Sequence, residues 1–236
     1  MSKLILVRPG EEHINEIRAY RDEWRAHDTH SHGDSGLYKK EDIADWVNFC
    51  RLMKKKETAP NPKWVEADQF MLMREGEPRI LGMINFRHYL NDGYVSEHSG
   101  HIGYGVRPSE RRKGYAKAML ALCLEEARAC GLDKVLVCCD LDNAGSRSTI
   151  KACGGKFERL AITGAEVDER YWIYLGGSPE SHSHTPGDAV LLDQSQGNAS
   201  PGHSQPQNTS APEGNHLDNF YSAREEEAAF PPATAW

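Results

Sequence analysis

A basic loop is the stretch of this sequence whose residue types point most directly to chemistry. It follows a short apolar run that ends at Val106, and it consists of Arg111, Arg112, Lys113 and Gly114. The segment after it has helical spacing, with apolar residues three and four apart at Ala116, Met119, Leu120, Cys123, Leu124 and Ala127. The first N–H groups of a helix lack internal partners, and the helix dipole adds positive charge there. The loop therefore predicts an anion site suited to phosphate, with an ordinary glycine turn as the alternative interpretation.

Composition limits the kinds of protein that this chain can be. Its 236 residues fit one domain plus an appendage, and 39% hydrophobic and 27% charged content is typical of a globular protein. The formal net charge of −7 falls after residue 175, and the near-neutral remainder does not predict nucleic-acid binding. No apolar run is long enough to span a membrane, and we expect no signal peptide and a cytoplasmic location. The six cysteines lack Cys-x-x-Cys spacing, which favours free thiols over a zinc site.

The order of predicted elements alternates between strands and helices up to residue 175. Hydrophobic periodicity predicts strands at 4–7, 64–74, 79–89, 101–106, 134–140, 156–162 and 170–175, and helices at 11–26, 41–56, after the basic loop to Cys130, and 144–152. Residues 91–100 read as a loop. Residues 176–236 are rich in Gly, Ser, Pro, Gln and Asn, and we expect a disordered acidic tail.

This order resembles the GCN5-related N-acetyltransferase (GNAT) superfamily. Its signature Arg/Gln-x-x-Gly-x-Gly/Ala matches residues 111–116, and its asparagine after the next strand matches Asn143. The resemblance covers about residues 3–175. It implies an α+β acyl-CoA N-acyltransferase fold, with a mixed, mostly antiparallel, splayed sheet flanked by helices. The expected organisation is a GNAT domain at 1–175 followed by a tail at 176–236.

The resemblance also implies which residues hold acetyl-CoA. The backbone of Tyr104, Gly105 and Val106 would pair with the pantetheine arm like an added strand. The pyrophosphate would lie on the N–H groups of Arg111, Arg112, Lys113, Gly114, Tyr115 and Ala116. Asn143 would hold the pantetheine or phosphate side. An N–H group near Val106 would stabilise the oxyanion.

The catalytic groups are less well defined by the sequence. A base must take a proton from the acceptor ammonium, and the candidates near the fourth strand are Glu97, His98 and His101. Of these we predict Glu97 and His101, the alternative being solvated loop residues and a strand-edge histidine. The family often has a tyrosine acid in the helix after Asn143, but that position holds Ile150. Either the thiolate leaves without a protein acid, or Tyr104, Tyr115 or Tyr171 approaches from elsewhere, and the sequence leaves these alternatives open.

We expect an N-acetyltransferase that moves an acetyl group from acetyl-CoA to a primary amine by direct attack, without a metal. The alternative is a non-catalytic acyl-CoA-binding regulatory module whose tail recruits a partner. Acidic residues near the expected acceptor rim, Asp92, Glu97 and Glu169, favour a cationic small-molecule acceptor over a protein. We expect neither nucleic acid nor membrane as a partner, and family members often form homodimers. A P-loop nucleotide site is disfavoured because its Gly-x-x-x-x-Gly-Lys-Ser/Thr pattern is absent.

Overall fold

The structure is a computed structural model that describes residues 2–27, 31–91 and 95–176. Its strands are β1 (Leu4–Val7), β2 (Ala67–Arg74), β3 (Ile80–Arg87), β4 (Ile102–Val106), β5 (Lys134–Asp140), β6 (Lys156–Thr163) and β7 (Glu166–Tyr174). Its α-helices are α1 (Ile14–Ala26), α2 (Ile43–Leu52), α3 (Tyr115–Ala129) and α4 (Ala144–Ala152). The predicted tail lies outside the described residues from residue 177 onward, as does Asp92.

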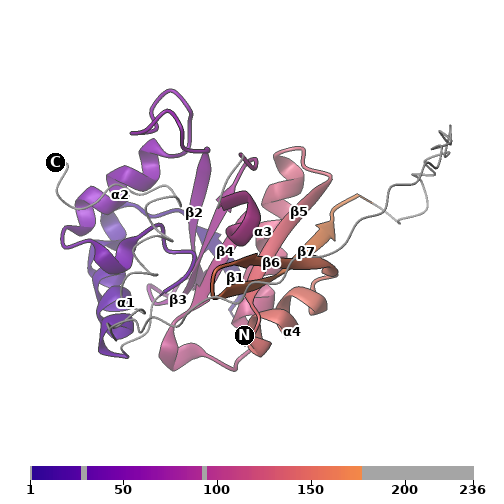
Figure 1. The fold of residues 1–236 in the computed structure, drawn as a ribbon. Coiled ribbons are helices and arrows are strands. Elements are labelled where there is room, and N and C mark those ends of the chain that lie inside the picture. The colour runs from indigo at the N-terminus through magenta and orange to yellow at the C-terminus, as the bar shows by residue number, and fades with distance from the viewer. Residues whose placement is uncertain (1, 28–30, 92–94, 177–236) are drawn as a thin grey trace, which may run out of the picture.

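The strands form two antiparallel sheets that meet between β4 and β5. One sheet has the order β1-β2-β3-β4, and the other has the order β5-β7-β6. Within the described residues, the backbone hydrogen bonding between the two sheets lies just before β4. There Gly100 bridges Val137, and the backbone N–H of His101 donates to the Leu136 carbonyl at 2.8 Å. Helices α1 and α2 cover one face, and α3 and α4 cover the other (Figure 1). The predicted splayed, mostly antiparallel α+β architecture is confirmed.

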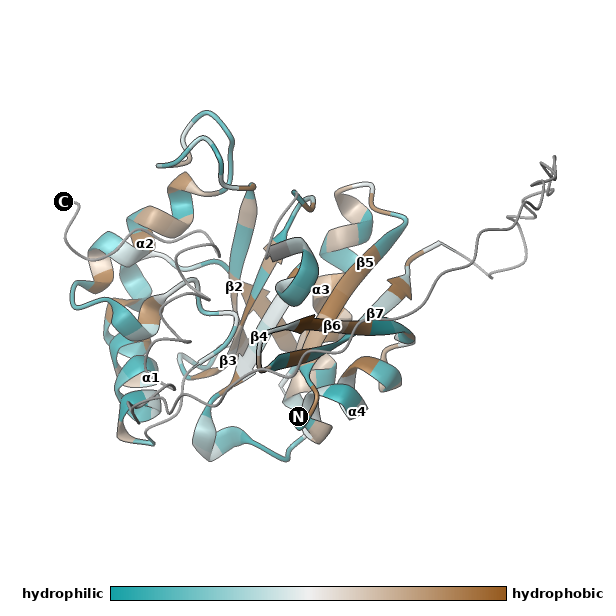
Figure 2. Ribbon diagram, in the orientation of Figure 1, coloured by the Kyte–Doolittle hydropathy of each residue, from teal (hydrophilic) through white to brown (hydrophobic). Residues whose placement is uncertain are grey.

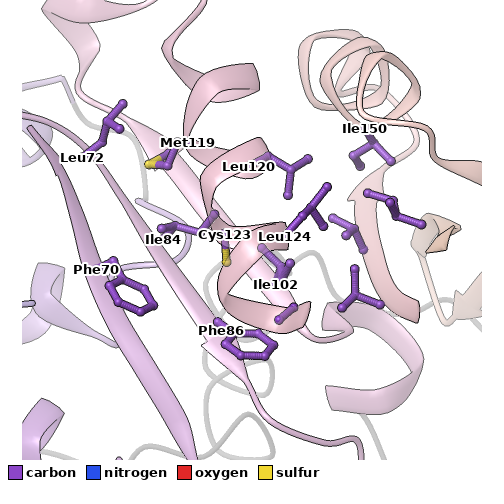
Figure 3. Close-up of a cluster of buried hydrophobic side chains, with 14 of the residues drawn as sticks. Phe70, Leu72, Ile84, Phe86, Ile102, Met119, Leu120, Cys123, Leu124 and Ile150 are labelled. Carbon is purple, nitrogen blue, oxygen red and sulfur yellow. The ribbon is translucent and has the colours of Figure 1, made fainter. Parts of the chain in front are cut away.

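A hydrophobic core on each face holds these layers together. Helices α1 and α2 pack on one side of β2 and β3 around Trp46, Met71 and Met83. Helix α3 packs on the other side, and its Met119, Leu120 and Cys123 face the strands (Figure 3). That second core continues across the gap into β5, which is brown along most of its length in Figure 2. Side chains therefore bridge the two sheets where the backbone does not.

Several element boundaries differ from the sequence predictions for local reasons. Helix α2 starts two residues later than predicted because the Asp42 carboxylate caps it, accepting the Ala44 N–H at 2.7 Å. The predicted loop at 91–100 contains a π-helical turn, Val95–Ser99, and the closing hairpin is longer than predicted. No helix in the described ranges is both long and apolar enough to cross a membrane.

Candidate active site

The direction of the backbone groups on β4 follows from its register with β3. The backbone N–H of Arg107 donates to the Leu81 carbonyl, and the backbone N–H of Arg87 donates to the His101 carbonyl. Backbone groups alternate in direction along an antiparallel pair, so the N–H and C=O groups of Gly103 and Gly105 face β3 as well. The N–H and C=O groups of Tyr104 and Val106 therefore point toward the gap beside β5. Within the described residues β5 forms no ladder with β4, which leaves these groups available to a ligand.

The basic loop has the backbone geometry of an anion site. Arg112 has φ 65° and Gly114 has φ 83°, so the chain turns sharply just before α3 and brings successive N–H groups to one side. Arg111, Arg112, Gly114, Tyr115 and Ala116 line a cavity of about 910 Å³. Lys113 does not line it, because its ammonium group pairs with Glu110 at 2.8 Å. The role predicted for Lys113, through its backbone N–H, stays a prediction.

Neighbouring side chains fix this loop and the helix opposite it. The Arg111 guanidinium stacks 4.8 Å from the centre of the Trp24 ring. The Tyr115 hydroxyl accepts a hydrogen bond from Arg74 at 2.6 Å. Asn143 caps α4, since its Oδ1 accepts the Ser146 N–H at 3.0 Å, and it lines the same cavity. The site thus joins the start of α3, the start of α4 and the gap beside β4.

The loop at 31–36 forms the opposite wall of the cavity. Gly33, with φ 70°, lies so close to β4 that a Cβ there would overlap the Gly103 carbonyl oxygen. Beneath it the Ser35 hydroxyl donates to Gln69 at 2.5 Å and accepts from the Asn85 amide at 3.0 Å. Burial raises the pKa of Asp34 to about 6. This wall of the cavity is therefore polar and closely packed.

Glu97 is placed on the surface of the β6–β7 hairpin rather than on the cavity wall. Its carboxylate forms two hydrogen bonds with Arg159, at 2.6 and 2.7 Å, and these lower its pKa. A lowered pKa makes a carboxylate a weaker base. Glu169, another acid expected at the rim, pairs with Arg147 at 2.5 Å. Arginines therefore neutralise the two rim acids that the structure describes.

His101 joins the two sheets. Its ring Nδ1 accepts the Leu136 N–H at 2.9 Å, and its backbone N–H donates to the Leu136 carbonyl. Burial lowers the pKa of His101 to about 4, with the charge of Arg87 adding to the effect. The ring lies outside the cavity lining. The catalytic role predicted for Glu97 and His101 stays a prediction, and their geometry gives both a structural function.

His98 and Asp168 form a buried pair on the cavity wall. His98 Nδ1 lies 2.6 Å from Asp168 Oδ2, and His98 Nε2 lies 2.9 Å from the Thr163 hydroxyl. Both His98 and Asp168 line the cavity. Asp168 was missed at the sequence level because it lies 70 residues from His98 and only the β5–β7 pairing places it beside the gap. His98 itself was one of the three candidates.

The hydroxyl groups named as candidate acids lie in different places. Tyr104 reaches from β4 to α4, where its hydroxyl lies 2.9 Å from Ser146 Oγ, and burial raises its pKa to about 12. The Tyr171 hydroxyl donates to Glu169 at 3.0 Å, and its ring is not part of the cavity lining. Ile150 is fully buried in the core. Of the candidates, Tyr104 lies nearest the gap, and Ile150 serves packing.

Comparison with family models supplies the deciding observation. Residues 3–156 match the model described as an acetyltransferase (GNAT) domain. The chain belongs to the GNAT acetyltransferase family. Membership identifies the acetyl donor as acetyl-CoA, as the sequence predicted. No curated protein matches the sequence significantly.

Solved structures share the fold of this GNAT protein at low identity. A ribosomal L7/L12 alpha-N-protein acetyltransferase in complex with coenzyme A matches with TM-score 0.55 and 14% identity, covering 74% of this chain and 95% of the other. An enzyme from Salmonella typhimurium that modifies the N-terminal serine of L7/L12 matches with TM-score 0.52 and 14% identity, covering 74% of this chain and 96% of the other. The microcin C7 self-immunity acetyltransferase, in complex with acetyl-CoA and AMP, matches with TM-score 0.52 and 18% identity, covering 73% of this chain and 92% of the other.

Proposed function

We propose that this GNAT protein transfers an acetyl group from acetyl-CoA to a primary amine by direct attack. The observation that carries the proposal is the pair of residues Tyr104 and Val106, whose backbone groups face the gap between the sheets. A pantetheine arm has amide groups that can pair with them as an added strand would. Five residues of the basic loop and the start of α3 line the same cavity, namely Arg111, Arg112, Gly114, Tyr115 and Ala116, and a helix N-terminus suits a pyrophosphate.

The His98–Asp168 pair serves as the proton acceptor in this proposal. The incoming amine must lose a proton as its nitrogen bonds to the thioester carbonyl carbon. His98 and Asp168 share one short contact, so the proton is received by the pair and is not assigned to either residue. The Val106 N–H, which points into the gap, is the donor for the developing oxyanion. The sulfur then leaves with the electron pair of the C–S bond.

Hydrogen exchange on single amides tests where the donor binds. On addition of acetyl-CoA, exchange at Tyr104 and Val106 should slow by at least about tenfold, because both N–H groups gain an acceptor. Gly103 and Gly105 are matched controls on the same strand, since their N–H groups already bond to β3. Equal protection of all four amides, or of none, would contradict the proposed pairing.

A second measurement separates the enzyme from a non-catalytic acyl-CoA-binding module. The full chain is incubated with acetyl-CoA and a panel of primary amines, and free thiol and acetylated products are followed by absorbance and mass spectrometry. The proposal requires product with at least one amine. Tight binding of acetyl-CoA without any acetylated amine would favour the module. The structures with the same fold include one that acts on a protein N-terminus, so the panel includes a peptide.

A further inference from the structure

Arg87 is a partly buried arginine that, unlike the buried Arg107 and Arg170, has no acidic partner among the described residues. It ends β3 and lines the cavity. Its Nη1 donates to the Gly100 carbonyl at 3.1 Å, which uses one of the five N–H groups of a guanidinium. In the described part of the chain, no carboxylate lies within ion-pair distance of it. The remaining donors are thus available to a ligand in the cavity.

The contrast with Arg107 and Arg170 shows that this arrangement is costly. Arg107 pairs with Glu16 and Glu23, and Arg170 pairs with Glu158. A buried charge without a counter-charge is destabilising because desolvation is not offset. Consistent with this, burial lowers the pKa of Arg87 to about 10. An anionic group of a ligand would offset the cost.

The position of Arg87 assigns that anion to the amine acceptor rather than to acetyl-CoA. Side chains alternate between faces along β3, and Ile84 and Phe86 lie in the core with α3, whereas Met83 lies in the core with α1 and α2. Asn85 and Arg87 therefore point to the face covered by α1 and α2. The loop that suits the pyrophosphate lies instead at the start of α3. Arg87 is also near the proton-accepting pair, because Gly100, which it contacts, is two residues from His98.

The acids on the acceptor side do not cancel this charge. Glu97 is held by Arg159, and Glu169 by Arg147. Asp168 is held by His98. Asp34, which also lines the cavity, accepts the backbone N–H groups of Gly36 and Tyr38. The rim was expected to select a cationic acceptor, but in the described part of the chain none of these acids forms an ion pair with the Arg87 guanidinium.

We propose that Arg87 binds a carboxylate of the acceptor, which is therefore a small molecule carrying both a primary amine and a carboxylate. The planar guanidinium can donate two parallel hydrogen bonds to a carboxylate, which fixes the orientation of the molecule. The amine then lies toward His98 and Asp168. This assignment rests on the proposed acetyl transfer and narrows its acceptor to one chemical class.

The test compares amino carboxylates with their matched carboxamides. The wild-type chain is supplied with acetyl-CoA and a panel of α-, β- and γ-amino acids, the corresponding amides and a peptide amide with a free N-terminus. At least one amino acid should be acetylated with kcat/KM about 100-fold above that of its amide. Acetylation of only amides or the peptide, or of no amino carboxylate, would overturn the proposal.

Variants of Arg87 connect that preference to the residue. In Arg87→Gln the ratio between acid and amide should fall to within about threefold, through a higher KM for the acid. Arg87→Lys keeps the positive charge but cannot donate two parallel hydrogen bonds, so it should give an intermediate ratio. Arg18→Gln, at an exposed arginine on α1, is the control and should leave the ratio unchanged. An unchanged ratio in Arg87→Gln would refute the assignment.

Two further measurements test the role of Arg87 and need no acceptor amine. Arg87→Met should leave the melting temperature unchanged or raise it, because no ion pair is lost, whereas Arg107→Met should lower it. A fall in Arg87→Met as large as that in Arg107→Met would show a structural role instead. Slowed exchange at Tyr104 and Val106 with acetyl-CoA, measured in Arg87→Gln, separates failure of this assignment from failure of donor binding.

Discussion

Gly33 determines how closely the acceptor-side loop can approach β4. It has φ 70°, and a side chain there would overlap the Gly103 carbonyl. Gly76, in the β2–β3 turn, has φ 80° with open space around it. The two glycines therefore separate the effect of backbone conformation from that of close contact.

Substitution by alanine makes this difference measurable. Gly33→Ala should lower the free energy of unfolding by more than about 3 kcal/mol, because the strain of positive φ adds to the overlap with β4. Gly76→Ala should cost only about 1 kcal/mol, which is the strain alone. Urea unfolding of both variants tests this. Equal losses would show that the loop can move away from β4 without cost.

The buried pair of His98 and Asp168 also makes a prediction at the level of single residues. Asp168→Asn should lower kcat/KM by about 100-fold or more, the usual contribution of a general base, while the affinity for acetyl-CoA is unchanged. Glu97→Gln is the matched change at the base predicted from sequence, and it should have a much smaller effect. Steady-state kinetics with any accepted amine distinguishes them. A larger loss of kcat/KM in Glu97→Gln than in Asp168→Asn would favour Glu97, which the sequence predicted, as the base.

At the level of elements, an ion-pair cluster attaches α1 to the end of β4. Arg107 binds Glu16 at 2.5 Å and Glu23 at 2.6 Å, and Glu23 also accepts the Ser109 N–H at 2.8 Å. Burial raises the pKa of Glu23, but the hydrogen bonds from Arg107 and Ser109 outweigh it and lower the pKa to about 2. The cluster thus positions the start of the basic loop.

The pH dependence of stability should reveal this cluster. Because the pKa of Glu23 is lower in the folded state, its contribution is complete above its unfolded pKa and decreases as pH falls toward about 2. Glu23→Gln should therefore cost about 3 kcal/mol at pH 7 and roughly half as much near pH 3. Urea unfolding at the two pH values measures it. Glu41→Gln, which removes an exposed pair with Arg25, is the control with a smaller effect.

Elements defined by local patterns were predicted well from the sequence. The apolar run of β5 and the helix at 144–152 were both placed correctly, because burial of a continuous run and helical periodicity are local properties. The π-helical turn at Val95–Ser99 was not predicted. It is held by Arg170, which donates to the carbonyls of Ser96 and Glu97 from more than 70 residues away. Single-sequence patterns contain no such distant contact.

The same distinction explains which part of the site was predicted. The donor side follows from a motif of adjacent residues, and the structure places five of the six loop residues on the cavity wall. The acceptor side depends on the close approach of Gly33 to β4 and of His98 to Asp168, which only the folded chain brings together. Arg87 gave no signal because a lone arginine at a strand end is common on protein surfaces.

At the level of the whole molecule, both hydrophobic cores lie within the described residues. Residues 1–175 were predicted to form the folded domain. A chain ending at Gly176 should therefore keep its melting temperature within about 2 °C and its affinity for acetyl-CoA within about twofold. Calorimetry on the two chains tests this. A large loss of either quantity would assign a structural or binding role to residues 177–236.

The continuous cavity has a consequence for inhibitor chemistry. The basic loop, the β4 gap, Arg87 and the His98–Asp168 pair all line one space. A molecule that joins an amino carboxylate to coenzyme A through a short linker would occupy both halves at once. Binding of the second half is then intramolecular, at an effective concentration of the order of millimolar or higher. Such a conjugate should bind far more tightly than either half alone, and Arg87→Gln should remove much of that advantage.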